Sequence, residues 1–115
     1  MAESSSIEKR PPNADALEAV KQAEAVLDYL DDRRANGEHR TAGFVEQYLM
    51  WSRRLAEAEC QAVSTKAERI AAIKAHIERI RTSVPLTYNG EVTHPQAEIT
   101  NYYFAEAKVW LARVE

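Results

Sequence analysis

Thr65-Lys-Ala-Glu-Arg-Ile-Ala-Ala-Ile-Lys-Ala-His-Ile-Glu-Arg-Ile-Arg-Thr-Ser-Val84 is the stretch that decides the fold. It opens with a threonine followed three residues later by a glutamate, the pair that forms a capping box at the start of a helix. Its apolar residues then recur at alternating spacings of three and four, at Ile70, Ile73, Ile77, Ile80 and Val84. This period predicts a helix with one buried stripe. Pro85 should end or kink the helix because it lacks an amide donor.

His76 stands between two isoleucines of that stripe. We expect its side chain at the margin of the apolar face, partly exposed to solvent.

Two helices are predicted before this one. The first follows Asn13, which can cap it, and ends near Gly37, which suits a left-handed terminator. Its apolar stripe comprises Val20, Ala23, Leu27 and Leu30. The second opens at Thr41, and a longer seam follows at spacings of four and three, with Phe44, Tyr48, Trp51, Leu55, Ala58 and Ala62.

The fourth predicted helix is capped by Thr93 and carries aromatic residues on several sides. Tyr102, Tyr103 and Phe104 are consecutive and therefore span about 200° around a helix. Tyr103 and Trp110 share one stripe, and a second stripe comprises Phe104, Ala107, Leu111 and Val114. One seam cannot bury all of these rings. We expect either a central position in the core, with tyrosine hydroxyls at its rim, or a face that binds a partner or a second copy.

These segments predict an all-α fold. Short connections favour antiparallel neighbours, so the arrangement is either an up-down-up-down four-helix bundle or two tandem hairpins laid end to end. We expect a disordered tail over 1–12 and a single helical domain over 13–115, with hairpins at about 13–63 and 65–115. Each hairpin contains an Asn-Gly-Glu turn, a threonine cap and an aromatic helix, which suggests an internal duplication.

The second copy of this pattern, Tyr88-Asn-Gly-Glu-Val-Thr-His-Pro-Gln-Ala-Glu-Ile99, precedes an alanine-rich helix. It resembles the helical-hairpin repeat of the outer-membrane efflux (TolC-type) family and related bacterial helical proteins. In the first copy Gly37, Thr41 and Phe44-Val-Glu46 match more loosely. The resemblance implies coiled-coil-like helical hairpins. Because the export signal, barrel strands and much greater length of that family are absent here, it implies no transport activity.

Composition excludes several classes of protein. The 115 residues carry a formal net charge of −3, without the basic excess of a nucleic-acid binder. No apolar run approaches the roughly 20 residues that span a bilayer, and no signal peptide opens the chain, so we expect a cytoplasmic protein. The single cysteine, Cys60, stands in a helical pattern and is expected to be structural.

Little in the sequence points to catalysis, and we expect no cofactor and no enzymatic activity. Glycine-rich phosphate loops, nucleophile elbows and Cys-x-x-Cys motifs are absent. His39 and His94, with Glu38 and Glu91, fall in two turns predicted at one end of the bundle, but their spacing within each turn is not that of a metal motif. We expect solvated turn residues there. The arginines Arg33, Arg34, Arg40, Arg53 and Arg54 are expected on solvated faces, with Arg53 paired to Glu57 one turn on.

The sequence thus favours a non-enzymatic helical interaction or scaffolding module that binds a protein partner or a second copy. Its candidate partner-binding residues are the aromatic ones, Tyr48, Trp51, Tyr102, Tyr103, Phe104 and Trp110. An alternative is a small all-α enzyme or ligand-binding bundle with a cavity lined by arginine and glutamate. A third, suggested by the hairpin resemblance alone, is an envelope-associated adaptor.

Overall fold

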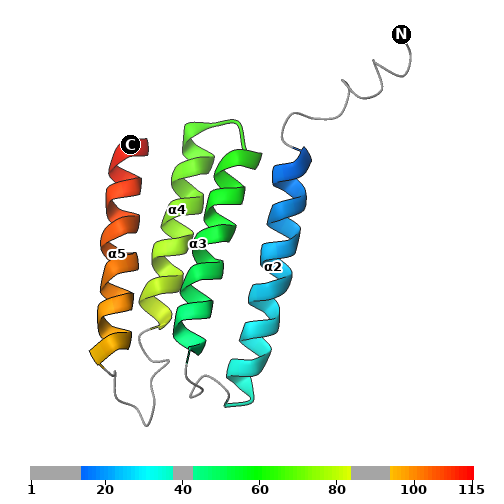
Figure 1. Cartoon of the computed structure of the whole chain (residues 1–115). Coiled ribbons are helices and arrows are strands. Elements are labelled where there is room, and N and C mark those ends of the chain that lie inside the picture. The colour runs from blue at the N-terminus through cyan, green and yellow to red at the C-terminus, as the bar shows by residue number, and fades with distance from the viewer. Residues whose placement is uncertain (1–13, 38–42, 84–93) are drawn as a thin grey trace.

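The computed structural model describes residues 14–37, 43–83 and 94–115 of the chain. These residues form four helices and no strand, which confirms the all-α prediction: α2 (Ala14–Ala35), α3 (Phe44–Ala62), α4 (Lys66–Ser83) and α5 (His94–Val114). Successive helices run in opposite directions, so the carboxyl end of α2 and the amino end of α5 lie at the same end of the molecule (Figure 1). The up-down-up-down order follows, with α3 and α5 parallel to each other.

Helix α4 forms as its sequence predicts. The Thr65 hydroxyl accepts the Glu68 amide hydrogen at 3.1 Å and donates to the Glu68 carboxylate at 2.7 Å, so the threonine and glutamate of the expected capping box contact each other. Ile73 and Ile80 are fully buried, while Ile70 and Ile77 are partly buried at the edges of the stripe. The helix is described to Ser83, two residues before Pro85.

Helix α3 begins later than predicted and is buried on two sides. Its N-cap is Gly43, in the left-handed region at φ 84°, rather than Thr41, which lies outside the described residues. The predicted seam is buried except for the partly exposed Trp51. A second buried stripe lies beside it and comprises Val45, Leu49, Ser52 and Ala56. Two stripes are needed because α3 contacts each of the other three described helices.

Helix α2 packs through the predicted single stripe, with Ala23, Leu27 and Leu30 buried and Val20 packed against them. Gly37 follows its end at φ 84°, as expected of a terminator. A β-carbon at residue 37 would have no atom within 4 Å, so lack of space does not require a glycine here. The left-handed backbone conformation alone explains why this residue is glycine. Among the described helices, α2 makes close backbone contact with α3 alone.

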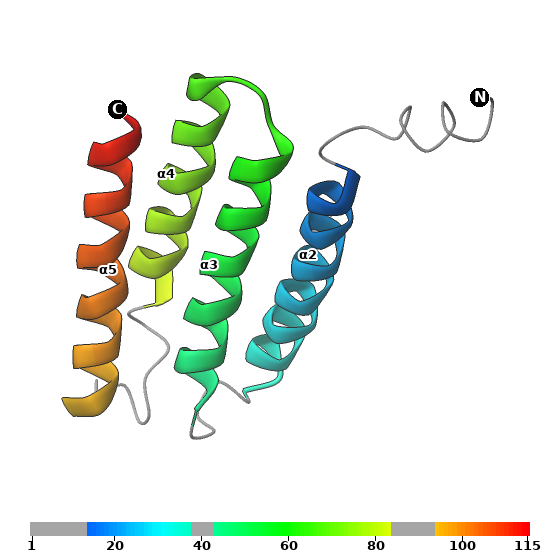
Figure 2. The same cartoon turned by 45° about the horizontal axis from the view of Figure 1, so that its top comes forward.

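Helix α5 lies on the other side of the molecule, against α4 and, less extensively, α3. Figures 1 and 2 show the consequence, because α2 and α5 stand at opposite edges with α3 and α4 between them. The bundle is therefore open: its first and last described helices do not close on each other, and among the residues of α5 whose burial is described, 97–114, only Ala107 is fully buried. The second Asn-Gly-Glu turn lies outside the described residues, so the internal duplication stays a prediction.

Candidate functional site

The six candidate aromatic residues occupy different environments. Tyr48 is buried, with its ring stacked on Phe44 and the Arg34 guanidinium 5.8 Å from its ring centre. Four more are partly buried and pack against the core or its margin: Trp51, Tyr103, Phe104 and Trp110. Tyr102 differs from all of them because 63% of it is exposed. Of the predicted set, this residue is the one best placed to meet a partner.

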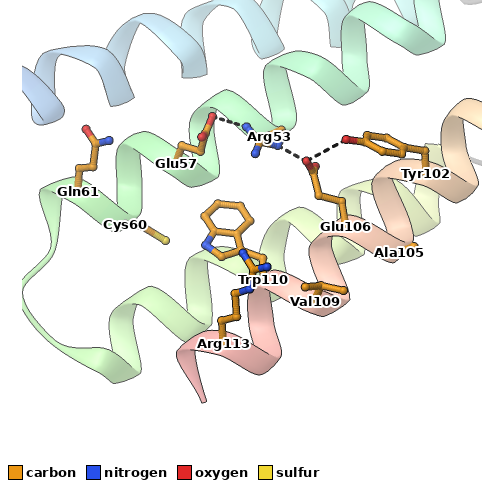
Figure 3. A pocket seen from close by; sticks show the side chains of 10 residues that line it. All are labelled: Arg53, Glu57, Cys60, Gln61, Tyr102, Ala105, Glu106, Val109, Trp110 and Arg113. Carbon is orange, nitrogen blue, oxygen red and sulfur yellow. Dashed lines mark hydrogen bonds and ion pairs between the residues drawn. The ribbon is translucent and has the colours of Figure 1, made fainter.

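Tyr102 lies in a groove between α3 and α5. A hollow of about 630 Å³ runs from it toward the carboxyl ends of both helices, lined by Arg53, Glu57, Cys60, Gln61, Tyr102, Ala105, Glu106, Val109, Trp110 and Arg113. Figure 3 shows these side chains. A smaller hollow of about 360 Å³ lies toward the amino ends and is lined by Glu46, Glu98, Ile99, Tyr102 and Tyr103. Because Tyr102 lines both hollows, we treat them as one feature, the α3–α5 groove.

Arg53 organises the charges in the middle of this groove. Its guanidinium contacts the Glu57 carboxylate at 2.7 Å, the predicted pair, and also donates to Glu106 of α5 at 2.7 Å. The Tyr102 hydroxyl donates to the other oxygen of Glu106 at 3.4 Å (Figure 3). The guanidinium also lies 5.8 Å from the centre of the Trp110 ring. Burial alone would lower the pKa of Arg53, but the two carboxylates hold it above its ordinary value.

Cys60 lines the same groove without the features of a reactive thiol. Its sulfur lies 3.7 Å from the Arg69 carbonyl oxygen, and burial together with the neighbouring glutamates raises the pKa of the thiol. A raised pKa leaves little thiolate at neutral pH. The predicted structural role fits these surroundings.

A buried polar cluster lies behind the groove, between α3 and α4. Arg79 donates from Nε to the Ser52 hydroxyl at 2.6 Å and from its terminal nitrogen to the Ser52 carbonyl at 3.0 Å. The Ser52 hydroxyl lies 2.7 Å from Nδ1 of His76. The hydroxyl has two acceptor lone pairs and one hydrogen, so it can accept from the guanidinium and share a second hydrogen bond with Nδ1, in the direction that the imidazole tautomer sets.

The position of His76 corrects the sequence prediction. We expected it partly exposed, and it is fully buried, with its ring edge-on to Trp110 at 6.4 Å between centres. Burial, and then the charges of Arg79 and Arg53, lower its pKa from 6.5 to about 4. Among the described residues no hydrogen-bond partner reaches Nε2. The histidine is thus a neutral core residue that links α3, α4 and α5.

A serine hydroxyl 2.7 Å from a histidine is also the geometry of an activated nucleophile. Here neither side chain is exposed to solvent, and the serine oxygen accepts a hydrogen bond from the Arg79 guanidinium. A substrate therefore has no route to the hydroxyl, and the pair acts as a packing and hydrogen-bonding element.

The outer face of α5 carries a regular exposed stripe, which we call the α5 seam. Its five residues recur at spacings of 4-3-4-3 and are all exposed: Glu98, Tyr102, Ala105, Val109 and Ala112. Tyr102 and Val109 are two of the large exposed apolar residues of the described chain, at 63% and 52%. This spacing is the one by which a helix packs on a neighbouring helix. The seam borders the α3–α5 groove and shares four residues with it: Glu98, Tyr102, Ala105 and Val109.

The predicted turn cluster cannot be placed. Glu38, His39 and Glu91 lie outside the described residues, as does the side chain of His94. In the part of the chain that the structure describes, histidine, cysteine, aspartate and glutamate side chains nowhere gather in threes in a way that could hold a metal ion.

Sequence reasoning missed Ser52, Arg79, Glu106 and the α5 seam. The second stripe of α3, which contains Ser52, is visible as a 4-3-4 pattern and could have been found. The Arg53–Glu106 contact joins residues 53 positions apart, and local spacing carries no signal for it. The α5 seam was missed because apolar residues occur on every side of α5, so the sequence does not distinguish an exposed stripe from a buried one.

Comparison with known proteins adds no relative. No family model matches the chain, and no match was found among curated proteins or solved structures. None of the described helices is both long and apolar enough to cross a bilayer.

Proposed function

We propose that this protein is a non-enzymatic helical interaction module that docks a protein helix on the α5 seam and the adjoining α3–α5 groove. The observation that carries the proposal is the seam itself: apolar side chains at helix-packing spacing, exposed on a helix that already packs on its opposite side. An arriving helix would bury Tyr102 and Val109, whose exposure is otherwise unfavourable.

The charges of the groove support a protein ligand. Arg53 is held between two carboxylates, so the centre of the groove is polar and its negative charge is compensated in part. Interfaces combine such a paired polar rim with aromatic anchors, and tyrosine, tryptophan and arginine are the residues most often found to dominate binding. Tyr102, Trp110 and Arg53 are these three types within one groove.

The chain offers a matched control for the test. Tyr29 on α2 is exposed to 59%, close to the 63% of Tyr102. A photo-crosslinking amino acid placed at residue 102, in cells that make the protein, should give a discrete protein adduct, while the same group at residue 29 should give none. Adducts of equal yield at both positions, or none at either, would show that the α5 seam is not a docking surface.

A specific observation also favours the alternative function, a ligand-binding bundle. The larger hollow of the groove is lined by arginine and glutamate, as that alternative requires, and has room for a small molecule. Thermal-shift screening would separate the two functions. A small molecule that stabilises the wild type but not Trp110→Ala would favour this second function over protein docking.

For localisation we keep the cytoplasm, the sequence-based expectation. The hairpin resemblance and the envelope-associated adaptor role remain hypotheses. Finding the protein in a periplasmic or membrane fraction would favour the adaptor.

A further inference from the structure

We infer that the helix docked on the α5 seam is α5 of a second copy of this chain, in an antiparallel, two-fold symmetric pair. This inference rests on the proposed function and names the partner. Two features carry it: the order of large and small residues along the seam, and the distribution of charge along the groove.

The seam residues alternate in size. Tyr102 and Val109 are large or branched, and Ala105 and Ala112 are small. In an antiparallel pair centred on residue 107, Tyr102 faces Ala112 of the second copy and Ala105 faces Val109. Each of the four layers then joins one larger and one smaller side chain, so the helices approach closely without leaving voids. A parallel pair in register would place tyrosine on tyrosine and alanine on alanine, which packs less evenly.

The groove is charged differently at its two ends. Glu46 and Glu98 line the end near the start of α5, and Arg113 lines the opposite end. In the antiparallel pair, Arg113 of one copy lies level with residue 101 of the other, only about 4.5 Å along the axis from Glu98. The acidic end of each groove therefore meets the basic end of the other, twice by symmetry. Such a surface is self-complementary, as an isologous interface requires.

Glu106 lies near the two-fold axis, where the two copies bring like charges together. Arg53 of the same copy contacts this carboxylate at 2.7 Å and compensates it in part, because the guanidinium also pairs with Glu57. On the other flank of the seam, the Lys108 ammonium lies 4.1 Å from the centre of the Phe104 ring of its own helix. The negative charge near the axis is thus compensated in part, and the end charges set the orientation.

Disulfide trapping tests the orientation. In a Cys60→Ser background, Ala105→Cys and Val109→Cys proteins are prepared separately and oxidised alone or mixed. The antiparallel pair places residue 105 beside residue 109 of the second copy, whereas two residues 105 lie too far apart to bridge. Mixed disulfides should exceed the homodimeric ones. Equal or greater yield of 105–105 disulfide would overturn the antiparallel arrangement.

Charge reversal tests the predicted contact between Glu98 and Arg113 of the second copy. The dissociation constant of the dimer is measured by sedimentation over a range of concentrations. The wild type should be dimeric, and either Glu98→Arg or Arg113→Glu should raise the dissociation constant about tenfold. The double variant should restore dimerisation, because both opposed pairs are re-formed with exchanged signs. Circular dichroism checks that each variant is folded. A double variant as weak as the single ones would contradict the predicted contact.

The same measurements separate this inference from the function it rests on. A wild type that stays monomeric at every concentration overturns self-pairing. If the crosslinker at residue 102 then still captures one defined protein, the docking function stands with a different partner. If it captures none, both proposals fail.

Discussion

Helices α2 and α5 are the two outer helices of the bundle, and each exposes two large apolar residues. On α2 these are Leu17 and Tyr29, which are twelve residues apart and so point in directions about 120° apart around the helix. On α5 they are Tyr102 and Val109, seven residues apart on one seam, with Ala105 between them and Ala112 beyond Val109. The number of exposed apolar residues is equal, and their arrangement differs. Scattered residues are ordinary surface, whereas the aligned seam is the feature on which we base the proposed docking surface.

On the faces that pack against the bundle the difference is reversed, because here α2 has the regular apolar stripe and α5 does not. Helix α2 buries three residues of a single stripe against α3, and its attachment is mainly apolar, with the Arg34 guanidinium over the Tyr48 ring as a polar contact. Over residues 97–114, helix α5 fully buries only Ala107 and is otherwise attached through partly buried rings, the Arg53–Glu106 pair and the contact between Trp110 and His76. This comparison predicts how each attachment responds to mutation and to pH.

The largest effect is expected where α2 meets α3. Leu27 is 6% exposed in this contact, and Leu27→Ala should lower the free energy of unfolding by roughly 2–5 kcal/mol because a cavity is left. Urea denaturation followed by circular dichroism measures it. Leu17→Ala on the outer face of the same helix is the control and should change stability by less than about 0.5 kcal/mol. Equal losses would mean that the α2 stripe is not the main contact.

The attachment of α5 should depend on pH through His76. Its pKa in the folded state, about 4, lies below the ordinary value of 6.5, so the unfolded chain binds the extra proton more readily. Stability is therefore complete above about pH 6.5 and is lost as the pH falls toward 4, by about 3 kcal/mol in all.

His76→Gln should make the free energy of unfolding depend less on pH over this range, because glutamine does not titrate. Comparing wild type and variant by urea denaturation between pH 4 and 7 isolates the contribution of this one histidine from other titrating groups. If both proteins lost the same stability over that range, the buried neutral histidine would not be its cause.

A smaller effect is expected from the ion pairs of the groove. Arg53→Met breaks its contacts with Glu57 and Glu106 and should cost about 1 kcal/mol, because these side chains are partly exposed to screening solvent. Arg81→Met removes only an exposed pair with Glu78 at 3.6 Å and should change stability by less than about 0.5 kcal/mol. Thermal denaturation at low and high salt compares the two variants. A salt-independent loss in Arg53→Met would point to packing instead of charge.

Features coded by neighbouring residues were predictable. The Thr65–Glu68 contact, the terminator at Gly37 and the buried positions of Ile73 and Ile80 follow from spacing and residue type alone. These are consequences of helix geometry, which acts over a few residues. The four-helix order followed from them because short connections leave few arrangements.

Features set by contact between distant segments were not predictable. His76 was expected at the margin of a stripe, but Trp110 and Ser52, from two other helices, enclose it. The predicted start of α3 at Thr41 was wrong. A threonine and a nearby glycine compete as helix-start signals, and Gly43 is the N-cap. The sequence singled out six aromatic residues as candidates, yet only the packing of α5 shows that Tyr102 is the exposed one.

The central claim is that α5, and not α2, carries the contact surface of this protein. Sedimentation velocity on two matched double variants tests it: Tyr102→Lys with Val109→Lys on α5, and Tyr29→Lys with Leu17→Lys on α2. Both pairs start from exposed positions, so neither should unfold the protein. We predict that the wild type and the α2 variant are dimers and that the α5 variant is a monomer. A monomeric α2 variant beside a dimeric α5 variant would contradict the claim.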